Sequence, residues 1–150
     1  MKIQTKYHGN IEIKQEDTIL FADGIPGFEE EKQYVILDFL EDDTYKILQS
    51  INTPEKAFVI TNPFLPFKQY EFELTNESKK ILNIEKSEDV LTYVILTIND
   101  PISESTANLQ APLIINLKNN KAKQIVLNDS TYTTKHYLFN NKSSTCQEVK

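Results

Sequence analysis

The sequence predicts a mainly β protein: a single closed or near-closed antiparallel β-barrel with one short helical segment around residues 76–84. Short segments rich in Ile, Val, Tyr, Phe and Thr recur about every 8 to 12 residues between turn signals, which is typical of barrels and sandwiches. Several of them alternate apolar and polar residues, as strands with one buried face do. With 150 residues, 39% of them hydrophobic and 25% charged, the chain is long enough for one domain with its own core.

Ten segments carry the strand pattern, and the turn signals lie between them. They are residues 2–7, 10–14, 18–22, 33–39, 45–51, 57–62, 70–74, 91–98, 112–118 and 122–128. In YEFEL, residues 70–74, the apolar residues fall on one face of the predicted strand and the two glutamates on the other. The unbroken apolar runs 34–37 and 93–96 predict strands that are buried on both faces.

The segment 74–90 interrupts the strand pattern and predicts the helix. Thr75 or Asn76 can accept hydrogen bonds from the first free amides, and Glu77 favours the positive end of the helix dipole. A short apolar stripe follows over residues 81–84. We expect one or two helical turns that pack as a lid on one end of the β structure.

Two turns are predicted in particular. The chain has three glycines, and Gly24 and Gly27 lie on either side of Ile25 and Pro26, where positive φ angles would let the chain reverse sharply. The side chains of Ile25 and Phe28 point either into the core or toward a partner, and the core is favoured. Near the end of the chain, residues 119–120 are two asparagines that predict a tight hairpin.

Residues 1–138 are predicted to form the domain and residues 139–150 a disordered polar tail that contains the single cysteine, Cys146. The N-terminus lacks the charged-then-apolar layout of a secretory signal, and no apolar run approaches the roughly 20 residues that span a bilayer. The sequence therefore predicts a cytoplasmic protein without membrane contact.

The net charge is −6, and the 16 basic residues are all lysines. Nucleic-acid binders gather basic residues on one face and favour arginine, whose planar fork binds phosphate and guanine. The composition therefore argues against direct nucleic-acid binding. It suits a basic protein partner better.

The sequence offers little for catalysis. Neither His8 nor His136 has neighbours at metal-ligand spacing, and no phosphate-binding glycine loop or serine elbow occurs. We expect no catalytic residues, no metal and no cofactor. The alternative is a small enzyme or ligand-binding barrel that uses His8 or His136 with a carboxylate in a central cavity.

The segment 61–72 is the candidate partner-binding element. Asn62 and Pro63 begin it, a second proline follows, and Phe64, Phe67 and Tyr70 are its aromatic residues. Prolines cannot donate to a strand ladder, so the segment should leave the sheet as a stiff, extended loop, and aromatic residues are favoured interface anchors. In the alternative interpretation, the phenylalanines plug one end of the barrel.

Asn108 and Gln110 pose a similar choice. They precede Pro112, which biases Ala111 toward extended geometry at the start of a strand. Their amides either fix a loop by bonding to the backbone, which is favoured, or are offered to a partner.

Read in order, the chain resembles the FliW family of flagellar assembly factors. The segments that carry this resemblance are KYHG, GIPGF followed by acidic residues and YVIL, LQS, TPEKAFVITNPF, YEFEL, DVLTYVILTI, TANLQAPLIIN and KQIVLNDSTYTTKH. They extend over about residues 2–138. One departure is the ending: many members stop near HPL, whereas this chain reads His136-Tyr137-Leu138 and continues.

The resemblance implies a small, non-catalytic β-barrel protein with two protein partners. Members of the family bind flagellin in the cytoplasm as its chaperone, and they also bind the RNA-binding translational regulator CsrA. When flagellin is exported, the freed protein captures CsrA and relieves its repression of flagellin mRNA translation. The resemblance therefore implies a switch between two partners.

Overall fold

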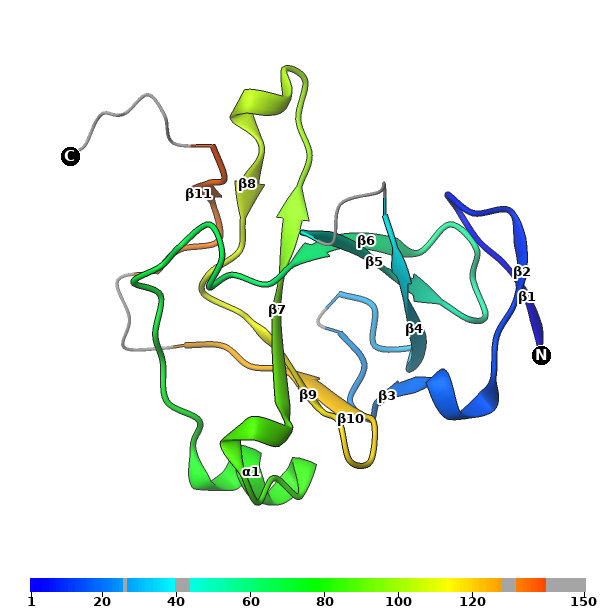
Figure 1. The fold of residues 1–150 in the computed structure, drawn as a ribbon, viewed down its shortest axis with the longest axis horizontal. Coiled ribbons are helices and arrows are strands. Elements are labelled where there is room, and N and C mark those ends of the chain that lie inside the picture. The colour runs from blue at the N-terminus through cyan, green and yellow to red at the C-terminus, as the bar shows by residue number, and fades with distance from the viewer. Residues whose placement is uncertain (26, 40–43, 128–131, 140–150) are drawn as a thin grey trace.

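In a computed structural model, the chain is mainly β, with residues 1–25, 27–39, 44–127 and 132–139 described (Figure 1). The strands are β1 (Lys2–Gln4), β2 (Asn10–Glu12), β3 (Ile19–Phe21), β4 (Gln33–Asp38), β5 (Tyr45–Ser50), β6 (Ala57–Thr61), β7 (Val90–Thr97), β8 (Thr106–Ala107), β9 (Leu113–Asn116), β10 (Lys121–Gln124) and β11 (His136–Tyr137). The helix is α1 (Asn76–Leu82), and the 3₁₀ turns are η1 (Gln15–Asp17), η2 (Ser87–Asp89) and η3 (Ile102–Glu104).

Seven of the described strands close into a barrel. The order around the ring is β3, β4, β5, β6, β7, β9 and β10, and β10 lies beside β3 again. The predicted barrel is confirmed, but β3 and β10 pair in parallel, with Leu20 opposite Lys121, whereas the other neighbours in the ring are antiparallel. A ring with an odd number of strands cannot alternate direction throughout. One parallel pair is therefore required, and the barrel is mixed.

Side chains alternate between the inside and the outside of the barrel wall. On β7, Leu91, Tyr93 and Ile95 pack against the interior core, whereas Val94 and Leu96 belong to a cluster outside the barrel. This is the period of two that the pleated backbone imposes. The buried members of the interior core are Ile19, Phe21, Ile25, Tyr34, Leu48, Ile60, Leu113, Ile115 and Ala122.

Elements that lie outside the ring cover parts of the wall. The β1–β2 hairpin packs on Val35, the segment from β6 to α1 packs on the outward residues of β7, and Leu82 of α1 packs on Ile114 and Ile125. This covering explains why the runs 34–37 and 93–96 are apolar on both faces, as the sequence predicts.

The glycine turn between β3 and β4 has the predicted backbone. Gly24 and Gly27 have φ angles of 69° and 90°. A side chain at Gly24 would also bring its Cβ to 2.5 Å from the Cα of Glu29, so both the conformation and the space require glycine there. Pro26, the third predicted residue of this turn, lies outside the described residues.

Ile25 and Phe28 both face the core. Ile25 is 2% exposed and belongs to the interior cluster. The Phe28 ring packs edge-on against Phe58, with the ring centroids 5.4 Å apart. The structure therefore confirms the orientation toward the core, which the sequence analysis favoured over one toward a partner.

The predicted helix is confirmed as α1. Thr75 is its N-cap, and its Oγ1 accepts a hydrogen bond from the Ser78 amide at 3.1 Å. Asn83 ends the helix in the left-handed conformation, with φ 57°. Short polar residues are favoured at both positions because their side chains or permissive backbone satisfy the free groups at helix ends.

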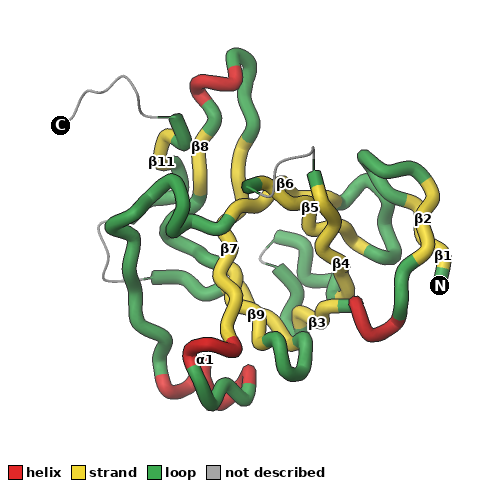
Figure 2. Tube along the Cα trace, viewed as in Figure 1, coloured by secondary structure: helices red, strands yellow, loops and turns green. Residues whose placement is uncertain are grey.

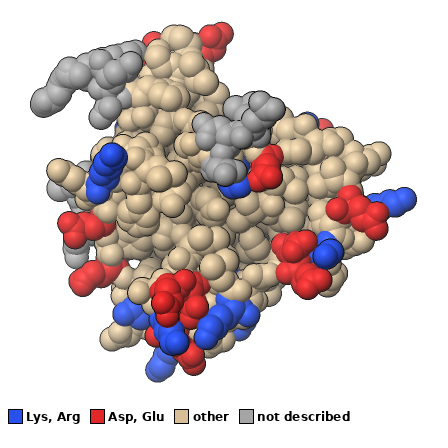
Figure 3. Space-filling view, viewed as in Figure 1, with Lys and Arg blue, Asp and Glu red and all other residues tan. Residues whose placement is uncertain are grey.

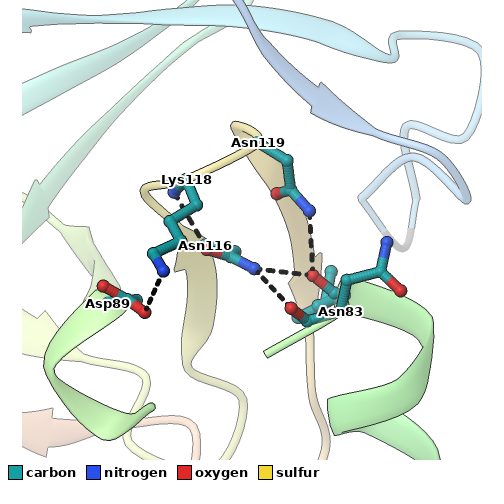
Figure 4. Close-up of polar contacts among 6 residues, drawn as sticks. Asn83, Asp89, Asn116, Lys118 and Asn119 are labelled. Atoms are coloured by element: carbon teal, nitrogen blue, oxygen red, sulfur yellow. Dashed lines mark hydrogen bonds and ion pairs between the residues drawn. The ribbon is translucent and has the colours of Figure 1, made fainter. Parts of the chain in front are cut away.

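Two asparagines of the β9–β10 hairpin hold the end of α1 (Figure 4). Asn116 is 1% exposed, and its Nδ2 donates to the carbonyl oxygens of Leu82 at 2.8 Å and Asn83 at 3.1 Å. Asn119 Nδ2 donates to the Leu82 carbonyl at 3.1 Å. The helix is therefore fixed near the lower end of the barrel in Figure 1. It packs on the outside of the wall, against Ile114 and Ile125, and does not cover the end of the barrel as predicted for a lid.

The hairpin itself forms at the predicted place. Asn120 has a φ angle of 56°, and β9 and β10 pair with Asn116 opposite Lys121. Lys118 Nζ lies 3.6 Å from the Asp89 carboxylate, so the hairpin also contacts η2.

The predicted strand at 70–74 is wrong. These residues form no strand, although Tyr70, Phe72 and Leu74 are more buried than the two glutamates between them. The alternation is real because the side chains pack against the outer wall, but no neighbouring strand pairs with the backbone. The two-residue strands β8 and β11 were not predicted, because they are too short for a periodic pattern.

Two further predictions concern the ends of the chain and membranes. Phe139 packs against the outer cluster, and residues 140–150, which include Cys146, lie outside the described residues, so the predicted division at 138 stays a prediction. Within the described ranges, no helix has the length and apolar character that crossing a bilayer requires.

Candidate partner-binding surface

The segment between β6 and α1 leaves the barrel and runs along its side (Figure 2). Asn62 Oδ1 accepts a hydrogen bond from the Phe64 amide at 2.9 Å, and the Pro63 carbonyl accepts one from the Phe67 amide at 2.9 Å. The Phe67 carbonyl accepts another from the Tyr70 amide at 3.0 Å. The predicted extended conformation is therefore wrong for this part. An asparagine followed by proline favours turns, since the side chain accepts from the backbone and proline fixes φ.

Tyr70 anchors the segment to the outer wall. Its side chain is 4% exposed, and its hydroxyl donates to the Leu109 carbonyl at 2.7 Å. Burial, together with the neighbouring Tyr132, raises the pKa of Tyr70, so the phenol stays protonated and can donate. Tyr70 was predicted to contact a partner, but a side chain buried in this way holds the loop instead.

The loop divides into buried and exposed residues. Pro63 is buried and Phe67 half-buried, and the Phe67 ring lies 6.4 Å from the His136 ring. Phe64 and Leu65 are 43% and 54% exposed. Of the predicted aromatic residues, Phe64 is therefore the one available to a partner. Leu65, which sequence reasoning missed, is displayed beside it, and its position between two prolines is the signal that pointed to it.

Phe64 borders a groove of about 350 Å³ on the outside of the barrel. Its apolar lining residues are Phe64, Phe72, Leu74, Ile84, Val90 and Ile114. Lys79, Lys86 and Glu85 add two positive charges and one negative charge at the edge. We call this feature, together with Leu65, the outer groove. It joins three segments that are distant in sequence, so no local pattern predicts it.

Asn108 and Gln110 do not join the outer groove. Asn108 Oδ1 accepts hydrogen bonds from the amides of Gln110 at 3.2 Å and Ala111 at 3.1 Å, which is the loop-fixing role that was favoured. Asn108 lines a different depression, beside Ile25 and Phe28. Between Asn108 and Gln110, the Leu109 carbonyl accepts the hydrogen bond from the Tyr70 hydroxyl. Asn108 itself lies on the side of Ile25 and Phe28, away from the outer groove.

Both histidines contact backbone groups. His8 Nε2 lies 2.6 Å from the Asp38 carbonyl oxygen, and His136 Nε2 accepts a hydrogen bond from the Thr133 amide at 2.8 Å. Burial lowers the pKa of His136, which is consistent with a neutral ring that accepts at Nε2. Within the described residues, no group of three or more histidine, cysteine or acidic side chains has the arrangement of a metal site.

The chain matches the family described as FliW protein over residues 2–138. It is 52% identical over 136 residues to the flagellar assembly factor FliW of Bacillus subtilis strain 168, which covers 91% of this chain and 95% of that protein. It is 51% identical over 142 residues to the flagellar assembly factor FliW of Geobacillus kaustophilus strain HTA426, and this match covers 95% of this chain and 98% of that protein.

A solved structure is similar across the whole fold. The crystal structure of the flagellar assembly factor FliW superposes with a TM-score of 0.91 at 48% identity, covering 95% of this chain and 100% of that chain. Matches of this extent include the barrel, α1 and the loop that carries Phe64.

Proposed function

Because the chain belongs to the FliW family of flagellar assembly factors, we propose that it binds flagellin and CsrA in turn and thereby couples flagellin export to flagellin translation. An assembly factor of this kind is non-catalytic, as the sequence predicts. The supporting observation is the agreement with the family over residues 2–138. In this proposal the protein works in the cytoplasm, holds flagellin before export and captures CsrA afterwards.

We propose the outer groove as the flagellin-binding surface. A chaperone must cover apolar surface of its client, and Phe64 and Leu65 expose apolar side chains beside an apolar floor. The turns of the loop and the Tyr70 anchor hold these side chains in place, so little conformational entropy is lost on binding. Lys79 and Lys86 at the edge favour a segment that carries acidic side chains next to its apolar ones.

Titration calorimetry with purified flagellin and purified CsrA tests the function. We expect micromolar or tighter binding of each partner, and a preformed flagellin complex should bind CsrA more weakly than the free protein does. A chain that binds neither partner would contradict the proposed function.

Phe64→Ala tests the surface. We expect flagellin binding to weaken by about tenfold while the melting temperature barely changes, because the side chain is exposed. Ile98→Ala is the matched control, since Ile98 is 47% exposed on the extension beyond β7 and away from the groove. Equal flagellin affinity in both variants would contradict the placement.

A further inference from the structure

The end of the barrel that holds the glycine turn opens into an apolar depression of about 400 Å³. Its apolar lining residues come from the turn, from barrel strands and from the segments next to them: Ile25, Phe28, Phe58, Ile95, Ala111 and Val126. Val126 is 52% exposed, and Phe28 and Phe58 are half-buried, so the depression presents apolar surface to solvent. We call this feature the Phe28 depression.

Two lysines lie at this depression. Lys135 is the one charged side chain among the described residues that line it, and it is exposed. Lys56 Nζ lies 4.1 Å from the centroid of the Phe28 ring, where the negative face of the ring attracts the cation. Glu29 bonds to the Gly27 amide of the turn instead and is not a lining residue. An apolar floor with cations beside it fits an apolar segment that also carries carboxylates.

The segment that joins β7 to β8 has the complementary chemistry. It comprises residues 98–104 and projects beyond the barrel at the top of Figure 1. Ile98 and Ile102 are 47% and 62% exposed, and its charged residues are Asp100 and Glu104. On the face that Figure 3 shows, the charged side chains at the top of the molecule are acidic. Among the residues that the structure describes, neither carboxylate forms an ion pair. We call this segment the β7–β8 arm.

Hydrogen bonds within the arm hold it in one conformation. Asn99 Nδ2 donates to the Glu104 carbonyl at 2.7 Å, and the Asn99 amide donates to Ser105 Oγ at 2.9 Å. The Pro101 carbonyl accepts a hydrogen bond from the Glu104 amide at 3.0 Å. These bonds leave the isoleucines of the arm exposed. They also mean that the arm loses little conformational entropy when it binds.

The arm and the Phe28 depression are neighbours in the molecule. Thr97, which precedes the arm, lines the depression, and so does Ile95. No residue of the arm is among the described lining residues, so the arm does not fill the depression of its own chain. A two-fold axis beside Thr97 would place each arm over the depression of the other copy. Reciprocal contacts of this kind close at two chains.

We propose that the Phe28 depression binds the β7–β8 arm of a second copy of this chain, in a reciprocal dimer. Ile102 packs on the apolar floor, and Glu104 meets Lys135. Because the arm offers only two exposed isoleucines, the dimer is weak and forms at about 10 to 100 µM. The outer groove and the Phe28 depression share none of their described lining residues, so this inference does not depend on the proposed function.

Sedimentation velocity over a concentration series tests the proposal. The parent should pass from monomer to dimer between about 1 µM and about 1 mM. Ile102→Lys should weaken the dimer about tenfold or more, because it removes the apolar anchor and places a cation near Lys135. Leu117→Lys is the matched control, since Leu117 is 50% exposed at the opposite end of the barrel, and this variant should associate as the parent does. Melting curves check that each variant is folded.

Charge reversal tests the pairing of the arm with the depression. Glu104→Lys and Lys135→Glu should each weaken self-association about tenfold, because each of these dimers contains two contacts between like charges. An equal mixture of the two variants should associate about as tightly as the parent, since both contacts of the mixed dimer again join opposite charges. Asp17→Lys is the control for the charge change, because Asp17 and Glu104 are each the last residue of a 3₁₀ turn without buried residues.

A parent chain that stays monomeric up to about 1 mM would overturn the proposal. Equal self-association of Ile102→Lys and Leu117→Lys would overturn it as well, because the dimer would then use another surface. A mixture of Glu104→Lys and Lys135→Glu that stays monomeric would show that these two side chains do not meet. Flagellin does not enter these measurements, so their failure leaves the proposed function untouched.

Discussion

The two faces of β7 and β9 line surfaces of different chemistry. The outer groove, on Val90 and Ile114, has Lys79, Lys86 and Glu85 at its edge. The depression at the end of the barrel that holds Leu117, which we call the barrel mouth, has Leu91 on its floor and is lined by three acidic residues and one lysine, Glu16, Asp17, Asp38 and Lys46. A single pair of strands can line both because neighbouring side chains point to opposite faces. Alternation thus gives one small barrel two surfaces of different chemistry.

The two surfaces also differ in what holds them. The outer groove depends on elements added to the wall: a loop anchored by Tyr70 and a helix held by Asn116. The mouth is formed largely by the barrel strands themselves, with η1 at its edge. Changes that loosen the added elements should therefore impair the groove and spare the mouth.

The largest effect is expected for Tyr70→Ala. Removing a buried aromatic side chain that also donates to the Leu109 carbonyl should lower the free energy of unfolding by about 3 to 5 kcal/mol. Urea denaturation measures this change. Tyr70→Phe is the control that keeps the ring, and it should cost only about 1 kcal/mol. Equal stability of the alanine variant and the parent would show that the loop is not anchored there.

Asn116→Ala should come next. The substitution removes the hydrogen bonds from Asn116 to the carbonyls of Leu82 and Asn83, and Leu82 keeps its bond from Asn119. We expect the free energy of unfolding to fall by about 1 to 3 kcal/mol. Hydrogen exchange should show faster opening of α1 and little change in β4 and β5. Asn119→Ala, which removes a longer bond to the Leu82 carbonyl and an exposed bond from the Lys121 amide, should have a smaller effect. If both variants lost the same amount of stability, Asn116 would not be the main residue that holds the end of α1.

Thr75→Ala tests the other end of the helix. Loss of the N-cap bond to the Ser78 amide should cost about 1 kcal/mol, because one amide at the helix start loses its partner. Thermal melting of Thr75→Ala and of the neighbouring Asn76→Ala measures the difference. A larger loss for Asn76→Ala would mean that the cap lies one residue later.

The smallest effect is expected at the mouth, for Asp38→Asn. The Lys46 bond lowers the folded-state pKa of Asp38, so its contribution to stability is present above the unfolded pKa and is lost as the pH falls through the folded value. The carboxyl is exposed, so the contribution is small. Melting temperatures of parent and variant should differ slightly at pH 7 and converge below about pH 4. A difference that widens in acid would contradict this sign.

Local features of the fold were predictable from sequence because their causes are local. Thr75 caps the helix, Gly24 and Gly27 take positive φ, and residues 119–120 turn the hairpin, each through its own backbone or a near neighbour. Pairing was harder. The parallel contact of Leu20 with Lys121 joins residues a hundred positions apart, and residues 70–74 have a strand pattern without a strand beside them.

The candidate surfaces were predicted in part. The aromatic loop was found from its prolines and phenylalanines, but which residues are buried depends on contacts such as Tyr70 with Leu109, far along the chain. The barrel mouth was not predicted at all. Glu16, Asp38 and Leu117 belong to different segments, and only closure of the barrel brings them together.

The most direct test of the account compares Phe64→Ala with Ile98→Ala, each titrated with purified flagellin and followed by thermal melting. We predict that Phe64→Ala weakens flagellin binding by about tenfold with a melting temperature close to that of the parent, whereas Ile98→Ala binds flagellin as the parent does. If the two variants bind flagellin equally well, the outer groove is not the flagellin-binding surface.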